Sequence, residues 1–395
     1  MGKQKLSIVI SSTYAESGKY MPLIKKLERE ICCCYGIGFP RNWKYTNEPL
    51  EKMVLTKIPT RVSWFLIEPM CKLMKLPLYY SYWCIQRIFD AFYSRRVAKD
   101  DSTIVFTYPL LLKTVKSAKK AGKVVVVEAG NSEPIREYKR IMEEYNKYGI
   151  KHKYIYGNLR YGNMCKQSYE IADYIINISN VSMQTYINAG YPREKLKLIP
   201  MTGTDFYSES SNVCGGEEKE KAFITTVYHS FIKGTQRLLL AWSEADVKNY
   251  KLYVVGELCE DMIEFVNKYG PFQNVVFVGH RSDLCEWYKK FNAVGILLSL
   301  SEGAGRVVPE MMTFGFPMLV SRDATCDIVR DGYNGWIVDY YDKRKVIEII
   351  RYLTDDWNRV DKLKDNVISS VEHRTMKDWS LELADFLRKL LIEES

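Results

Sequence analysis

The feature that most constrains the fold is a series of short, continuously apolar segments separated by amphipathic stretches. Strands without polar alternation are typical of parallel sheets that helices cover on both faces. The series occurs once in each half of the chain: 6–11, 103–107, 123–127, 174–179 and 197–200, and then 222–227, 252–256, 275–279, 293–298 and 318–321. The pattern predicts an α/β protein with two doubly wound, Rossmann-like domains of parallel sheet.

The length of the chain agrees with two domains, because 395 residues are too many for one ordinary core. Residues 206–220 are polar and lack periodicity, so we expect a linker there. It would join an N-terminal domain, 1–205, to a C-terminal domain, 221–375. Residues 376–395 follow as an amphipathic helix with Trp379 on its apolar side.

The positive charge is unevenly distributed. The chain has a net charge of +9, and residues 1–100 alone hold 17 Lys and Arg against 8 Asp and Glu. The remainder is therefore neutral, and we expect the N-terminal part to meet an acidic partner.

Composition excludes several classes. No C-x-x-C motif and only four histidines are present, which argues against a zinc site. Scattered single thiols favour a reducing, cytoplasmic location. No nucleic-acid-binding module is recognisable, so no nucleic acid partner is expected. A dehydrogenase fingerprint would need a third glycine where Val308 stands.

A glycine-rich turn follows the apolar segment 293–300, where the chain reads SEGAGRVVPEMMTFGFP from 301 to 317. We expect a helix from the Arg306 position to the stop signals Gly315 and Pro317. Glycines allow close backbone approach, and the N–H groups of a first helical turn attract anions. The turn therefore predicts a phosphate or diphosphate site at Gly303, Ala304, Gly305, Arg306 and Val307.

Two glutamates bracket this turn, and carboxylates do not bind phosphate. They accept hydrogen bonds well, so Glu310 suits a ribose and Glu302 suits the hydroxyls of a second sugar. A ligand ordered ribose, diphosphate and sugar is a nucleotide sugar. The alternative is that Glu302 is a solvated loop residue and Glu310 a helix-surface charge.

The motif E-G-x-G-x-x-x-x-E-x-M, followed by G-x-P, resembles the donor motif of the retaining GT-B glycosyltransferases of family 4. Further stretches resemble this family in the same order, at 169–179, 190–205, 232–242 and 329–339. The resemblance is good from 169 to 339 and poor over the first 168 residues.

The resemblance implies a GT-B fold, with two domains facing a cleft and the last helix crossing back to the first domain. It also implies transfer of a sugar, with retention, from a nucleotide-diphosphate sugar to a glycan or lipid-linked acceptor. Lys233 would reach the donor phosphates, and His280 would lie near the nucleobase. No metal and no further cofactor are expected, since the chain lacks a D-x-D motif.

The chain departs from the family at two places. The family's arginine before the lysine is replaced by Tyr228 and His229, and its N-terminal-domain histidine is absent. Glu128 follows the segment 123–127. Two interpretations of this residue stay open: it contacts the sugar, or it is a charge at the end of a strand with no further role. Gly18, after the first segment, should lie near the donor. These departures leave a non-catalytic sugar-nucleotide-binding protein as an alternative.

Residues 62–97 combine many aromatic side chains with five cations. Ile85, Ile88, Phe89 and Phe92 would share one helical face. Two interpretations stay open. One is a surface that contacts lipid headgroups or a lipid-phosphate acceptor, with peripheral membrane contact. The other is a helix packed on the first sheet.

Overall fold

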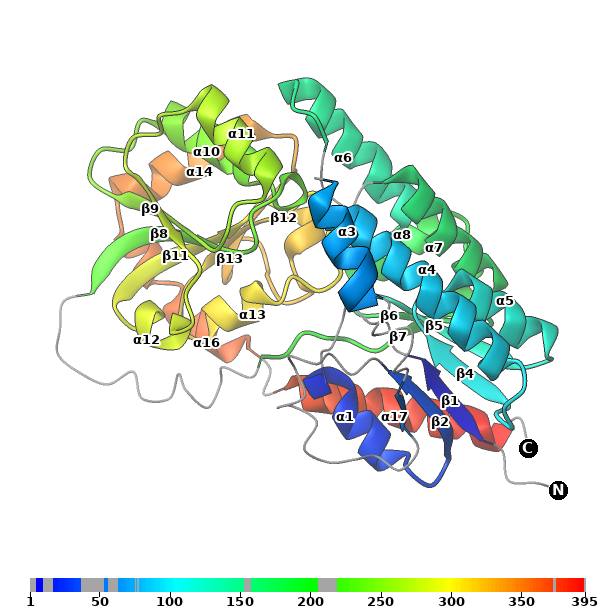
Figure 1. Cartoon of the computed structure of the whole chain (residues 1–395). Coiled ribbons are helices and arrows are strands. Elements are labelled where there is room, and N and C mark those ends of the chain that lie inside the picture. The colour runs from blue at the N-terminus through cyan, green and yellow to red at the C-terminus, as the bar shows by residue number, and fades with distance from the viewer. Residues whose placement is uncertain are drawn as a thin grey trace.

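The computed structural model describes residues 5–9, 17–36, 53–55, 63–74, 76, 78–152, 158–204, 219–371 and 374–393. These residues form two parallel sheets side by side, each accompanied by helices (Figure 1). The predicted linker, 206–220, lies outside the described residues except for its last two positions. In the described part of the chain, no helix has the length and apolarity needed to span a bilayer.

The N-terminal sheet has seven parallel strands in the order β3-β2-β1-β4-β5-β6-β7. They are β1 (Leu6–Val9), β2 (Ile31–Gly36), β3 (Met53–Leu55), β4 (Ile104–Thr107), β5 (Val124–Ala129), β6 (Tyr174–Asn177) and β7 (Leu196–Leu198). The helical segments of this half are α1 (Ser17–Lys26), η2 (Ser63–Ile67), α3 (Glu68–Leu73), α4 (Leu78–Val97), α5 (Leu112–Lys120), α6 (Pro134–Tyr148), α7 (Leu159–Ile171), α8 (Asn180–Asn188) and η3 (Arg193–Lys195).

The C-terminal sheet has six parallel strands in the order β10-β9-β8-β11-β12-β13. They are β8 (Glu220–Thr226), β9 (Lys251–Val255), β10 (Val275–Gly279), β11 (Phe291–Leu297), β12 (Met318–Ser321) and β13 (Gly335–Val338). The helical segments are η4 (Phe231–Lys233), α10 (Thr235–Ala245), α11 (Glu260–Tyr269), α12 (Leu284–Tyr288), α13 (Val307–Met312), η5 (Arg322–Ala324), α14 (Lys343–Asp355), α15 (Asn358–Asp361), α16 (Lys364–Ser369) and α17 (Met376–Glu393).

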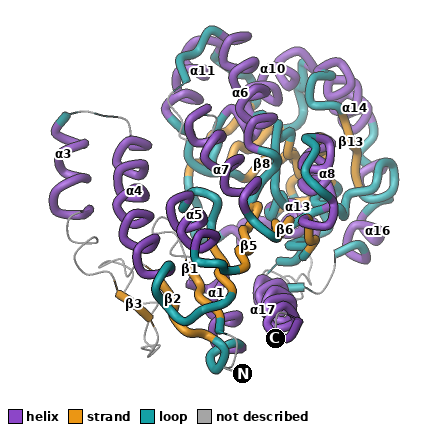
Figure 2. Tube along the Cα trace, turned by 90° about the vertical axis from the view of Figure 1, so that its right-hand side faces the viewer, coloured by secondary structure: helices purple, strands orange, loops and turns teal. Residues whose placement is uncertain are grey.

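Helix α17 packs on the N-terminal half, beside α1 (Figure 2). Trp379 is buried, and its indole Nε1 donates a hydrogen bond to the carbonyl oxygen of Ile199 over 3.1 Å. The backbone N–H of Leu23 in α1 donates to the hydroxyl of Ser380 over 2.9 Å. The apolar side of this helix is thus part of the same core as the first sheet.

The two chain segments that join the halves lie against each other. The backbone N–H of Thr204 donates to the carbonyl oxygen of Arg374 over 2.8 Å. A Cβ atom on Gly203 would lie 2.0 Å from the same oxygen, so a side chain there would force the segments apart.

Helix α6 connects the halves from the other direction. Ile141 and Tyr145 are buried together with the C-terminal core, and the Tyr145 ring stacks on Phe231 with centroids 4.4 Å apart. Arg237 pairs with Glu144 at 2.5 Å, and their side chains are 6% and 1% exposed. Either charge alone would be costly to bury, so loss of either residue should be strongly destabilising.

The helical face predicted in α4 packs inward. Ile85 and Phe89 are buried in the core of the N-terminal half, and Ile88 and Phe92 pack against it. Of the two interpretations, helix packing therefore holds for these four residues. Most of the exposed large apolar side chains of 62–97 lie on η2 and α3 or directly after α3, and Tyr80, near the start of α4, is exposed as well.

Candidate functional site

The strand order of the C-terminal sheet decides where a ligand can bind. Counted from β8, the order 3-2-1-4-5-6 reverses direction between β8 and β11. Ligands of doubly wound sheets bind at the carboxyl ends of the strands beside such a switch point. The segment after β8 carries Lys233, and the segment after β11 carries Glu302 and the glycine turn.

Lys233 and Glu302 meet at this point. The Lys233 ammonium lies 2.6 Å from Glu302 Oε1, and the Ser299 hydroxyl donates to the same oxygen over 2.5 Å. Gly234 makes this approach possible. Its φ of +72° is left-handed, and a Cβ atom there would lie 1.8 Å from the carbonyl oxygen of Leu298. The lysine is 28% exposed and the carboxylate 10%.

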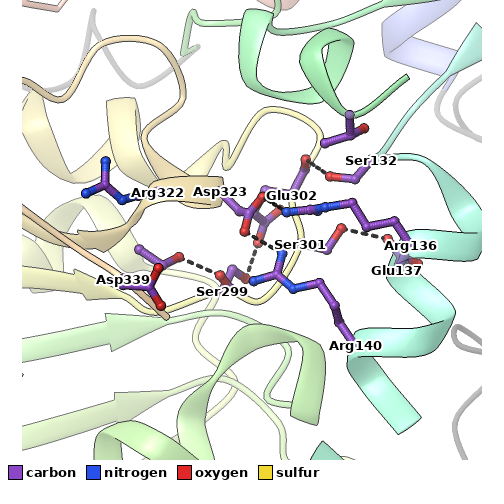
Figure 3. A network of polar contacts seen from close by, with 12 residues as sticks. Ser132, Arg136, Glu137, Arg140, Ser299, Ser301, Glu302, Arg322, Asp323 and Asp339 are labelled. Atoms are coloured by element: carbon purple, nitrogen blue, oxygen red, sulfur yellow. Dashed lines mark hydrogen bonds and ion pairs between the residues drawn. The ribbon is translucent and has the colours of Figure 1, made fainter. Parts of the chain in front are cut away.

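The glycine turn is buried against the N-terminal half (Figure 3). The hydroxyl of Ser132 donates to the carbonyl oxygen of Glu302 over 3.2 Å, and the hydroxyl of Ser179 donates to that of Gly303. A Cβ atom on Gly303 would lie 2.2 Å from the carbonyl oxygen of Gly130. Glycine at this position was predicted to let a ligand approach the backbone closely. In the structure, the backbone of the loop after β5 lies against it instead.

The other residues of the turn lead into α13. The Ala304 carbonyl oxygen accepts from the Cys326 thiol over 3.0 Å, and Gly305 has a φ of +24°. Arg306 precedes the helix and is exposed, and Val307 is its first residue. The helix ends at Met312, earlier than the predicted stop at 315. Glu310 lies one turn in, 3.8 Å from the Arg306 guanidinium and 18% exposed.

Glu137, in the first turn of α6, was not among the residues predicted from the sequence. Its Oε2 accepts from Ser301 Oγ over 3.0 Å and from Asn131 Nδ2 over 2.5 Å. Burial raises the pKa of this carboxyl to about 7, the nearby charge of Glu302 raises it too, and Ser301 and Lys233 oppose the rise. Two carboxylates from opposite halves thus lie around one lysine. No motif marks Glu137, because only the docking of α6 brings it here.

Arg136 and Arg140 hold α6 in this position. Their guanidinium groups pair with Asp323 of η5 at 2.8 Å and 2.6 Å (Figure 3). Asp323 is placed at the carboxyl end of β12, so the two ion pairs fix the start of α6 over the C-terminal sheet.

Three other predicted residues lie on other elements of the fold. Glu128 lies within β5 and is 1% exposed; the Tyr20 hydroxyl donates to its Oε2 over 2.5 Å. Gly18 is in the same helix as Tyr20, near its start. His280 is exposed after β10, two strands away from β8.

His229, one of the two residues found where an arginine was expected, is buried. Its Nδ1 lies 2.9 Å from the Thr235 hydroxyl and its Nε2 lies 3.0 Å from the carbonyl oxygen of Val255. Burial lowers the pKa of its imidazole to about 4. The side chain is therefore neutral at pH 7 and does not replace a guanidinium. Among the described residues, no group of three or more His, Cys, Asp or Glu side chains is arranged to hold a metal.

Comparison with known proteins points to one fold. Residues 213–370 match the family model described as glycosyl transferases group 1. An uncharacterised 41.2 kDa protein from the cps region of Klebsiella pneumoniae is 27% identical over 188 residues, 45% of this chain. The match spans about half of that protein, 51% of its length.

Solved structures match over nearly the whole chain. Alr3699/HepE of Anabaena, in complex with UDP, is 15% identical with a TM-score of 0.64, covering 98% of this chain and 100% of that one. Sucrose-phosphate synthase of Thermosynechococcus elongatus is also 15% identical, with a TM-score of 0.67 and coverage of 99% and 100%. The predicted fold class is confirmed: the chain has the two-sheet α/β fold of the GT-B glycosyltransferases.

Proposed function

We propose that the chain is a glycosyltransferase that moves a sugar from a nucleotide-diphosphate sugar to a glycan or lipid-linked acceptor. The observation that carries this proposal is the Lys233–Glu302 pair at the switch point, directly before the glycine turn. Both residues lie inside the segment that matches the glycosyl transferases group 1 model. The HepE structures, which hold UDP and UDP-glucose, make uridine nucleotides the first donors to test.

The chemistry follows from the positions of these groups. An incoming diphosphate offers Lys233 a second anionic partner, and the lysine then stabilises the charge of the departing nucleotide. Glu302, with its Oε1 held by Lys233 and Ser299, accepts hydrogen bonds from sugar hydroxyls. Glu310, one turn into α13, accepts those of the ribose.

The proposal includes retention of the anomeric configuration and catalysis without a metal. The motif from Glu302 to Glu310 supports retention, because it resembles that of retaining enzymes. The absence of a D-x-D motif from the sequence supports metal independence. Nuclear magnetic resonance of the product anomer tests the first point directly.

A second candidate is a protein that binds nucleotide sugars and catalyses nothing. Two observations favour it: Tyr228 and the neutral, buried His229 stand where the resembled family has an arginine, and Tyr20 donates a hydrogen bond to the buried Glu128. Both candidate functions require that the protein binds the donor. Only a glycosyltransferase would also turn it over.

The experiment is a thermal-shift screen against nucleotide sugars, followed by an assay for donor hydrolysis and transfer. Ligand binding to the native state raises the unfolding temperature by mass action. Lys233→Met should abolish turnover and weaken donor binding. Lys251→Met is the matched control, because Lys251 also lies near a glutamate, Glu220 at 3.9 Å, but on the exposed surface. If no nucleotide sugar stabilises the protein, the proposal is wrong; binding without turnover selects the second candidate.

A further inference from the structure

An exposed apolar surface lies on η2 and α3. We name it the α3 ridge; its members and their exposed fractions are Phe65 76%, Leu66 61%, Met70 49%, Leu73 85% and Met74 61%. Leu66, Met70, Leu73 and Met74 recur at helical spacing, so they share one face. Large apolar side chains that are exposed singly are normal, but a contiguous group indicates an interaction site.

The inner side of the same segment is packed, so the ridge is the outer face of an attached element. Ile67 and Cys71 are 8% and 5% exposed and belong to the core of the N-terminal half. Among the described elements, α3 packs on η2 and α4. Figure 2 shows α3 beside α4 at the outer edge of this half, with its other side turned away from the body.

The sequence that contains the ridge is rich in cations. Between residues 56 and 76 the sequence contains Lys57, Arg61, Lys72 and Lys75 against one acid, Glu68. The excess of Lys and Arg over Asp and Glu in the first hundred residues equals the net charge of the whole chain, +9. Apolar side chains flanked by cations suit the interface of a bilayer that contains anionic lipid.

The charge of this part of the chain argues against a second copy as the occupant of the ridge. A second copy would bring the same excess of cations to the contact, whereas an anionic bilayer carries the opposite charge. A bilayer needs no matching partner surface, so a short convex ridge is sufficient.

We propose that the α3 ridge inserts into the interface of an anionic bilayer and makes the protein a peripheral membrane protein. The exposed side chains enter the boundary between headgroups and acyl chains, and cations of this basic part of the sequence, such as the exposed Lys72, meet lipid phosphates. This inference does not depend on the proposed sugar transfer, because it rests on a different surface.

The test is co-sedimentation of the full chain with phosphatidylcholine vesicles, with and without phosphatidylglycerol. The protein should bind the mixed vesicles, bind pure phosphatidylcholine more weakly, and lose affinity as salt is added. Leu66→Ser combined with Leu73→Ser should lower the partition coefficient about tenfold or more, because apolar burial drives insertion. Both side chains are exposed, so the unfolding temperature should stay unchanged.

The matched control is Ile263→Ser combined with Ile368→Ser, two exposed isoleucines, 47% and 49%, of the C-terminal half. This variant should bind vesicles as the wild type does. The proposal is overturned if neither vesicle binds the protein, or if the ridge variant and the control bind equally. It is also overturned if light scattering shows a dimer that the ridge variant dissociates, since the ridge would then be a protein interface.

Discussion

Glu137 should make the stability of the protein depend on pH in an unusual direction. Its pKa rises from 4.5 to about 7 because the side chain is buried beside Glu302. Between these values the folded state holds a proton that the unfolded state has released. Stability is therefore greatest below about pH 4.5 for this group, and falls as the pH rises toward 7. Since one pKa unit corresponds to about 1.36 kcal/mol, the total loss is roughly 3 kcal/mol.

The perturbation is Glu137→Gln, which keeps an oxygen for Ser301 and Asn131 but cannot ionise. We would measure urea unfolding of both proteins at about pH 5 and about pH 8, where the Glu137 contribution should differ by roughly 2–3 kcal/mol. The variant should gain that amount relative to wild type on going to the higher pH. Glu143→Gln, at an exposed position of the same helix, is the control and should follow wild type.

The protonation of Glu137 should also change when a ligand binds. A diphosphate near Lys233 adds negative charge, which raises the pKa of Glu137 further, so donor binding should take up protons near pH 7. Calorimetry in buffers of different ionisation enthalpy measures this uptake, and Glu137→Gln should remove it. The reasoning is refuted if the variant differs from wild type by the same free energy at both pH values.

Three other predictions follow from the site and the fold. Glu310→Ala should weaken nucleotide binding by about 1.5–3 kcal/mol, the scale of hydrogen bonds to a charged group, and an unchanged calorimetric affinity for UDP would contradict the ribose assignment. Turnover should persist in excess chelator; activity lost to chelator and restored by manganese or magnesium would rule out metal independence. Deleting 376–395 should expose the core around Trp379 and lower the unfolding temperature or cause aggregation, whereas a soluble, fully active truncated chain would show that α17 is dispensable.

The strands of both sheets could largely be predicted, because buried parallel strands are continuously apolar in the sequence. Segments such as 275–279 and 318–321 match β10 and β12 residue for residue. β2 was missed because its sequence, ICCCYG, replaces branched apolar residues with cysteine. β3 and β13 were also missed.

The candidate site could be predicted where a single loop carries it, and not where two halves meet. Glu302, the glycine turn and Lys233 have recognisable local patterns, and the structure brings Lys233 and Glu302 together. Glu137 lies in an ordinary amphipathic helix, and its role depends on the ion pairs that dock α6. Glu128 was predicted to lie just after the end of its strand. In the structure, β5 includes Glu128, and the Tyr20 hydroxyl donates a hydrogen bond to its carboxylate.

The side-by-side crossing at Gly203 and Arg374 has a consequence for the order of events during synthesis. Helix α17 completes the core around α1 and β7, yet the ribosome makes it after every strand of the second sheet. The first sheet must therefore wait, with the faces of Leu23 and Ile199 uncovered, while about 190 later residues, 205–393, are translated, a delay of roughly 10–40 s at 5–20 residues per second. We expect the second sheet to form first, and the nascent first half to be the part of this protein that most needs a chaperone.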